Sequence, residues 1–141
     1  ARAVAAVTGQ PALADDSGIE VDALGGAPGP RSARYAGEGA TDEKNLRALL
    51  RAVAGVPAGG RTARYRAVAV VAWPVRRQVH AEGVSDGTLR TRPRGDGGFG
   101  YDPNFDPAGW DRTMAELEPE EKDRISHRGR ALRALAHVLR A

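Results

Sequence analysis

The segment LADDSGIEVDALGGAPG, residues 13–29, places two adjacent carboxylates, Asp15 and Asp16, at the end of a short apolar run. Residues 12–14 predict a short strand and residues 19–21 a second one, with a backbone turn at Gly18 between them. The two aspartates are therefore expected where a strand meets a loop, a place from which a carboxylate can present a divalent cation to a phosphate. A solvated turn is the alternative interpretation of such a pair.

The segments before and after this stretch predict helices and strands in alternation. Residues 1–7 resemble the tail of a helix that stops at Gly9. Thr41 and Asp42 can cap a helix whose apolar residues recur at helical spacing, and Gly55 and Pro57 end it. These apolar residues are Leu46, Leu49, Leu50 and Val53.

Three further strands are predicted over residues 64–73, 78–85 and 88–92. The first is rich in valine and alanine without strict alternation, which indicates a strand covered on both faces. The expected architecture is α/β, with a central mixed sheet flanked by helices. Near the end, Pro119 opens a short helical turn and Ser126 caps a terminal helix. The apolar stripe of that helix consists of Leu132, Leu135 and Leu139.

Length and composition restrict the class of protein. With 141 residues, 41% of them hydrophobic, residues 1–141 are expected to form a single domain. No apolar run approaches the roughly 20 residues that cross a bilayer, so we expect no membrane partner and a cytoplasmic location. The chain has no cysteine, so any metal must be bound by oxygen or histidine. The three histidines lack the spacing of zinc ligands.

The net charge of +3 comes almost entirely from arginine, with acidic residues interspersed throughout. Because a nucleic-acid surface needs clustered basic groups, we expect no nucleic-acid partner. Arg90, Arg92 and Arg94 do lie close together in the sequence. They can bind a small polyanion, or they can form a solvated strand edge, and the sequence leaves both interpretations open.

Two other blocks carry residue types suited to nucleotide chemistry: RGDGGFGYDP at residues 94–103 and EKDRISHRG at residues 121–129. In the first, Phe99 stands between glycines, which allow a ligand close to the backbone and leave an aromatic face open for base stacking. The alternative for Phe99 is an ordinary core position. In the second, His127 and Arg128 fall in the first turn of the terminal helix, where backbone N–H groups favour oxygen acceptors.

Together the three blocks closely resemble the inosine/xanthosine triphosphate pyrophosphatase family. The resemblance implies a Mg²⁺-dependent hydrolysis of ITP, dITP and XTP to the monophosphate and pyrophosphate, by an enzyme that is typically a homodimer. It assigns Asp16 as metal ligand and general base. It assigns substrate binding to Ser17, Phe99, Gly100, Tyr101, Asp102, Lys122, His127 and Arg128.

The resemblance also implies roles within the base pocket. Asp102 is expected to accept ring N–H groups of the purine, while Tyr101 supports the pocket. His127 and Arg128 are expected to donate to the 6-keto oxygen of hypoxanthine or xanthine. The 6-amino group of adenine leaves such donors unpaired, which costs about 1 to 3 kcal/mol each, so ATP is expected to be rejected.

The chain departs from the family's pattern before residue 1. Members of the family carry there a strand, a phosphate-binding loop and an acidic metal ligand, and none of these occurs here, so we expect the chain to be N-terminally incomplete. The alternative function is therefore a catalytically impaired nucleotide-binding remnant. A pyrophosphatase for modified pyrimidines is a second alternative, which the block Ser126-His127-Arg128 disfavours.

Overall fold

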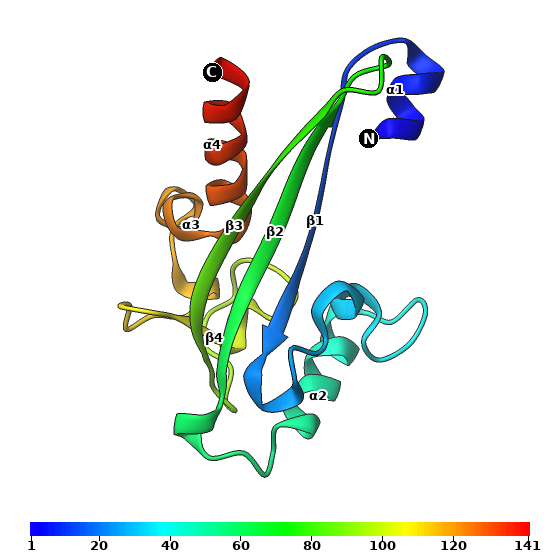
Figure 1. Cartoon of the computed structure of the whole chain (residues 1–141). Helices are drawn as coiled ribbons and strands as arrows, with labels where there is room; N and C mark the ends of the chain where they lie inside the picture. Colours follow the sequence, from blue (N-terminus) through cyan, green and yellow to red (C-terminus); the bar gives the residue numbers. More distant parts are fainter.

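Four strands form one sheet (Figure 1). A long helix packs along the sheet, a short helix lies beside the start of that helix, and two further helices lie at the ends of the strands. The structure is a computed structural model that describes residues 1–141. The strands, in sheet order, are β1 (Ala12–Val21), β2 (Thr62–Ala72), β3 (Gln78–Leu89) and β4 (Phe105–Pro107). The helices are α1 (Arg2–Thr8), α2 (Asp42–Ala52), α3 (Pro119–Ile125) and α4 (His127–Arg140). None of them is long and apolar enough to cross a bilayer.

The α/β class is confirmed, but the expected mixed sheet is wrong, because all three strand pairs are antiparallel. Residues 73–77 join β2 to β3, and a connection this short favours a hairpin between antiparallel neighbours. The other end of β2 continues the same arrangement with β1, in which Asp16 lies opposite Val68.

The turn predicted at Gly18 is also wrong, since β1 runs unbroken through it and Gly18 pairs with Arg66. Glycine is needed there for space: a Cβ atom on Gly18 would lie 2.1 Å from the carbonyl oxygen of Gly29. Gly87 has the same role in β3, where a Cβ atom would lie 2.2 Å from the carbonyl oxygen of Asp106. The strand predicted to break near Gly87 is therefore continuous from Gln78 to Leu89.

Burial alternates along β2: its odd-numbered residues are buried and most of its even-numbered residues are half-buried. The alternation is hidden in the sequence because Val68 and Val70 occupy half-buried positions. The prediction that both faces are covered is therefore wrong. One face packs against α4 through small side chains, and its core consists of Ala67, Ala69, Val71, Ala81, Ala131 and Leu135.

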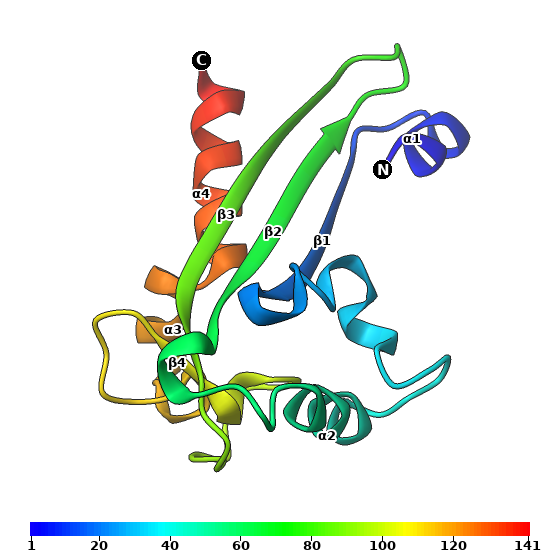
Figure 2. The same ribbon diagram turned by 60° about the horizontal axis from the view of Figure 1, so that its bottom comes forward.

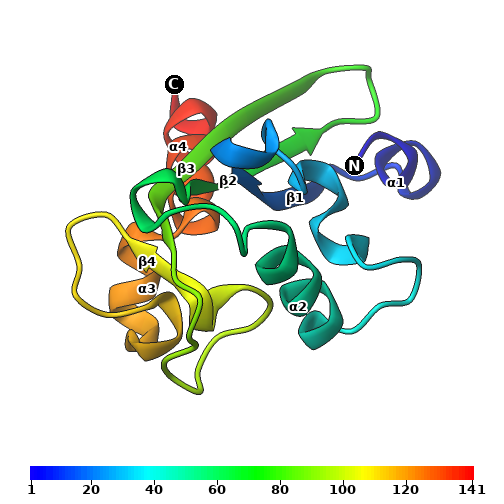
Figure 3. The ribbon, with the colours of Figure 1, turned by 90° about the horizontal axis from the view of Figure 1, so that it is seen from below.

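The larger core lies at the end of the sheet where α2, β4 and α3 meet, with α2 on the β1 side and α3 on the β3 side (Figure 3). Its most buried side chains include Ile19, Leu49, Phe105 and Met114. At the other end of the strands, α1 lies beside the hairpin (Figure 2), where Ala5 packs against Ala12 and Ala72. The helix ends at Gly9, as predicted.

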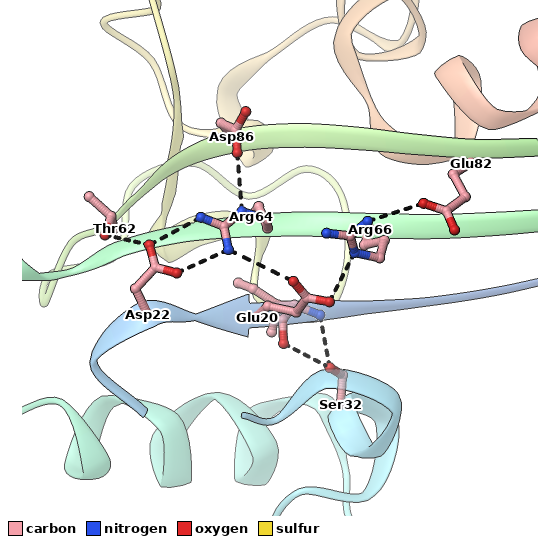
Figure 4. Close-up of polar contacts among 9 residues, drawn as sticks. Glu20, Asp22, Ser32, Thr62, Arg64, Arg66, Glu82 and Asp86 are labelled. Atoms are coloured by element: carbon pink, nitrogen blue, oxygen red, sulfur yellow. Dashed lines mark hydrogen bonds and ion pairs between the residues drawn. The ribbon is translucent and has the colours of Figure 1, made fainter. Parts of the chain in front are cut away.

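The second face of the sheet carries ion pairs in place of a hydrophobic cover (Figure 4). Arg64 forms ion pairs with Asp22, the residue that follows β1, and with Asp86 on β3, with shortest distances of 3.0 and 3.3 Å. Arg66 pairs in the same way with Glu20, at 3.0 Å, and with Glu82, at 3.1 Å. These cross-strand pairs satisfy the charged groups of a solvated sheet face.

Candidate active site

A cavity of about 150 Å³ opens where the middle of β1 and β2 faces the glycine loop, the start of α2 and the start of α4. It brings together residues that are far apart in the sequence and that come from all three predicted blocks. The predicted site residues on its wall are Ser17, Phe99, Gly100, Tyr101, Asp102, Lys122 and His127.

Asp102 is the polar centre of this cavity and is buried. Its Oδ1 accepts a hydrogen bond from the Tyr65 hydroxyl at 2.9 Å. Its Oδ2 accepts from the Lys122 ammonium at 2.6 Å and from the Phe99 N–H at 3.0 Å. Both carboxylate oxygens are therefore hydrogen-bonded within the protein. Asp102 thus positions the glycine loop and also lines the cavity.

The glycine loop needs its glycines at this point. Gly98 has a φ of +69°, a conformation that L residues rarely adopt, and a Cβ atom there would lie 2.2 Å from Oδ2 of Asp102. Beyond it, the N–H of Gly100 donates to Oδ2 of Asp42 at 3.1 Å. The loop is therefore held between Asp102 and the first turn of α2.

Phe99 projects from this loop with 61% of its surface exposed, which excludes a core position. The ammonium of Lys122 lies 4.6 Å from its ring centroid. The exposed ring offers a stacking surface next to a positive charge. The neighbouring Tyr101 is buried, and its hydroxyl donates to the carbonyl oxygen of Ser32 at 2.7 Å. Burial raises the pKa of Tyr101 to about 12, so its hydroxyl stays protonated.

His127 is the first residue of α4, and Ser126 caps the helix by accepting the Gly129 N–H at 3.0 Å. Its imidazole stacks on Tyr65, with ring centroids 4.7 Å apart. Burial, reinforced by the charge of Arg128, lowers the pKa of His127 to about 4, so the ring is neutral at pH 7. Its Nδ1 is buried without a hydrogen-bond partner. His127 lines the cavity as a neutral ring.

Asp16 lies apart from this cavity. It borders a second hollow of about 160 Å³ together with Glu20 and Arg66, while Ser17 borders both. The reason is the strand itself: adjacent side chains of β1 point to opposite faces, and Asp16 has the solvated one. Its side chain is exposed and makes no ion pair. No group of three or more His, Asp or Glu side chains in the chain is arranged to hold a metal ion.

Arg128 also lies outside the base cavity. Its Nε donates to Oδ2 of Asp15 at 2.6 Å. It borders an adjoining cleft, which shares Phe99, Lys122 and His127 with the cavity. The cleft and the cavity are thus two sides of one pocket, with Phe99 and Lys122 between them.

Of the three arginines near the glycine loop, two form ion pairs within the protein. Arg90 pairs with Asp106 at 2.9 Å, and Arg94 pairs with Glu116 at 2.7 Å. Arg92 is the one arginine of the three without an ion pair, so the two interpretations of this cluster stay open.

Sequence reasoning missed Tyr65 and Asp42. Tyr65 is a buried residue of β2, and its hydroxyl was the one available signal, since a buried hydroxyl needs a partner. Asp42 was predicted only as part of a helix cap. Thr41 alone caps α2, accepting the Lys44 N–H at 3.2 Å, which leaves Asp42 to bind the glycine loop.

Comparison with known proteins identifies the family to which this chain belongs. A sequence profile of the Ham1 family matches residues 1–138. The dITP/XTP pyrophosphatase of Geobacillus kaustophilus is 53% identical over 126 residues, which are 89% of this chain and 62% of that protein. The dITP/XTP pyrophosphatase of Streptomyces coelicolor is 51% identical over 140 residues, 99% of this chain and 70% of the relative.

Solved structures agree. A HAM1 protein from Coxiella burnetii superimposes with a TM-score of 0.92 at 44% identity, covering 99% of this chain and 72% of that one. The Ham1 protein of Staphylococcus aureus gives a TM-score of 0.91 at 39% identity, covering 98% of this chain and 71% of that one. The chain therefore spans between 62% and 72% of the length of these relatives, and it belongs to the Ham1 family.

Proposed function

We propose that this chain hydrolyses the noncanonical purine nucleoside triphosphates ITP, dITP and XTP to the monophosphate and pyrophosphate, and so removes them from the nucleotide pool. The single observation that carries the proposal is one cavity that the exposed ring of Phe99, the neutral imidazole of His127 and the buried carboxylate of Asp102 line together. Two relatives at about 50% identity bear the name dITP/XTP pyrophosphatase, which supports the same substrate class.

In the proposed complex the purine stacks on Phe99, and the buried donors and acceptors of the cavity meet its edge. A 6-keto oxygen satisfies donors from the start of α4, whereas the 6-amino group of adenine leaves them unpaired. Tyr65 and Asp102 keep the cavity in shape during this step, because each already has its partners within the protein.

The reaction is the attack of water on the α-phosphorus. A bond forms between the water oxygen and phosphorus, the bond to the α,β-bridging oxygen breaks, and pyrophosphate leaves. We assign Asp16 as the general base that takes the proton from the attacking water. Its carboxylate is exposed and unpaired, one residue before Ser17, which borders the base cavity. Ser17 is then placed to contact the substrate between the base and the phosphates.

We propose Mg²⁺ as the cofactor. Magnesium commonly uses one or two carboxylates together with substrate phosphate oxygens. Asp16 fits this mode because it is an exposed carboxylate without an ion pair, whereas Asp15 and Glu20 are each paired with an arginine. When bound, the ion would neutralise charge on the triphosphate. We further propose, by resemblance to the family, that the protein works as a homodimer and that it is located in the cytoplasm. Light scattering in solution tests whether it is a dimer.

The test is product analysis. The 141-residue chain is incubated with ITP, dITP, XTP, ATP or GTP, with and without Mg²⁺, and monophosphate and pyrophosphate are separated by ion exchange. We expect equal amounts of the two products from the first three substrates, a strong dependence on Mg²⁺, and little product from ATP. Binding of ITP without product would support the alternative, a nucleotide-binding protein without catalysis. Equal hydrolysis of ITP and ATP would contradict the assigned base pocket.

A further inference from the structure

We propose that Asp15 is a positioning residue for substrate selection: it holds Arg128 by its Nε, so that the terminal nitrogens of the guanidinium are presented to the substrate in a fixed orientation. The inference rests on the proposed function and deepens it. It gives the two adjacent aspartates separate duties, with Asp16 serving the phosphates and Asp15 serving recognition of the base.

The first support is the geometry of the pair. Asp15 and Asp16 are neighbours on β1 and point to opposite faces, so Asp15 faces α4. Its Oδ2 accepts from Arg128 Nε at 2.6 Å across 113 residues of sequence. The side chain of Asp15 is 30% exposed and that of Arg128 is 46% exposed. The two charges are therefore partly shielded from water, which strengthens the hydrogen bond relative to a fully exposed pair.

The second support is the set of Arg128 N–H donors that have no partner within the protein. The structure gives it no other hydrogen bond or ion pair. Arginine has five N–H donors in a planar fork, so the contact through Nε leaves four donors on the two terminal nitrogens. These belong to a residue that borders the cleft shared with Phe99, Lys122 and His127. Because the guanidinium is planar, the hydrogen bond at Nε also restricts the direction of the two terminal nitrogens.

The third support is that the backbone beneath Arg128 is already rigid. The start of α4 packs directly on β3: a Cβ atom on Gly83 would lie 2.0 Å from the carbonyl oxygen of His127. Ser126 caps the same turn. The remaining freedom at this point is the Arg128 side chain, and Asp15 is its one anchor in the protein. An unanchored arginine would lose this freedom only on binding substrate, at a penalty of roughly fivefold to thirtyfold in affinity.

The test compares kcat/KM for ITP and for ATP in Asp15→Asn, Asp15→Ala, Arg128→Ala and the double variant Asp15→Ala/Arg128→Ala. Asp106→Asn is the matched control, because it breaks a partly buried aspartate–arginine pair of 2.9 Å away from the pocket. We expect Asp15→Ala to lower the ratio of ITP to ATP by roughly fivefold to thirtyfold, through ITP alone. We expect no further loss from Asp15→Ala in the Arg128→Ala background, and an unchanged ratio in Asp106→Asn.

A second measurement does not depend on turnover. In ¹H,¹⁵N spectra, the Arg128 Nε–H resonance, assigned by its loss in Arg128→Ala, is expected to be sharp in the unmodified protein and to broaden and shift in Asp15→Ala. Thermal melting of every variant shows that it is folded. An unchanged ITP to ATP ratio in folded Asp15→Ala would overturn the proposal. So would a loss in Asp15→Ala that persists at full size when Arg128 is already alanine.

Failure of the proposed function gives a different result. If the unmodified chain binds ITP more tightly than ATP but releases no pyrophosphate, hydrolysis is refuted, and the same variant cycle is carried out on dissociation constants, where the same fivefold to thirtyfold change is expected. If the unmodified chain binds both nucleotides equally, Arg128 selects no base and the role assigned to Asp15 is refuted as well.

Discussion

The imidazole of His127 stacks on the phenol ring of Tyr65, with centroids 4.7 Å apart and ring planes 11° from parallel. The Tyr65 hydroxyl donates to Asp102, which in turn binds Lys122. A single buried side chain on β2 therefore joins the start of α4 to the glycine loop and to α3. It lies outside all three sequence blocks that indicated the function, yet it sets the relative positions of two of them.

The stability of the protein is expected to fall with acid because of His127. Burial lowers its pKa to about 4 in the folded protein, whereas an unfolded histidine titrates near 6.5. Between these values the unfolded chain binds more protons, so the free energy of unfolding decreases as the pH drops from about 6.5 to about 4, by up to about 3 kcal/mol. Below that range both states are protonated and this contribution changes no further.

Urea unfolding at a series of pH values measures this slope. His127→Gln should remove the part of the slope between pH 6.5 and 4, while His80→Gln, at an exposed histidine of β3, should leave it in place. A slope that is the same in His127→Gln and in the unmodified chain would show that other groups cause the acid sensitivity.

Tyr65→Phe is expected to destabilise the protein while preserving the ring stack. The change removes the one donor to Oδ1 of the buried Asp102, and a buried acceptor without a partner costs about 1 to 3 kcal/mol. Tyr35→Phe is the control, because Tyr35 is only half-buried and its hydroxyl makes no hydrogen bond within the protein. Equal free energies of unfolding for the two variants would mean that water replaces the Tyr65 hydroxyl.

The features that sequence reasoning predicted are those with local causes. The cap at Thr41 and the leucines that follow it specify α2, and Ser126 specifies the start of α4, because each signal acts within a turn or two of helix. The alternation of side chains along a strand likewise separates Asp15 from Asp16 without knowledge of the rest of the fold.

The features that it missed depend on distant partners. Gly18 suggests a turn because glycine permits one, but glycine is required there because the carbonyl oxygen of Gly29 packs where a Cβ atom would lie. Asp15 finds its partner 113 residues away at Arg128, which no spacing in the sequence encodes. The antiparallel sheet follows from strand pairing, which local propensity does not determine.

Asp16→Asn is expected to reduce ITP hydrolysis by several orders of magnitude at every Mg²⁺ concentration. The amide keeps the shape of the side chain but removes both the charge that favours Mg²⁺ and the basic oxygen that takes the proton. Pyrophosphate release over a Mg²⁺ titration measures the effect. Asp111→Asn serves as control, because Asp111 is exposed and borders neither the base cavity nor the hollow beside Asp16. An Asp16→Asn variant with the unmodified rate would exclude Asp16 as both ligand and base.

Phe99→Ala is expected to weaken ITP and ATP by the same factor. Every purine offers a face for stacking, and the loss of one aromatic platform is worth roughly 1 to 3 kcal/mol. KM for both nucleotides should therefore rise about fivefold or more, with the ratio of their kcat/KM values unchanged. Phe99→Tyr, which keeps an exposed ring, should restore both values. A change in the ratio would instead give Phe99 a part in discriminating the bases.

Gly98→Ala tests whether the loop depends on glycine for its backbone angle or for space. An alanine at φ +69° is strained by about 1 to 2 kcal/mol, and its Cβ would also lie 2.2 Å from Oδ2 of Asp102. Gly109→Ala has the first cost alone, because Gly109 has a φ of +83° and open space around its Cβ position. We therefore expect Gly98→Ala to lower the free energy of unfolding by at least about 1 kcal/mol more than Gly109→Ala. It should also lower kcat/KM for ITP by more than tenfold, since Asp102 must move away from Lys122 and Phe99.

Chemical unfolding and ITP kinetics of the two variants measure these differences. Equal effects of the two substitutions would show that Asp102 is free to move without consequence for the pocket.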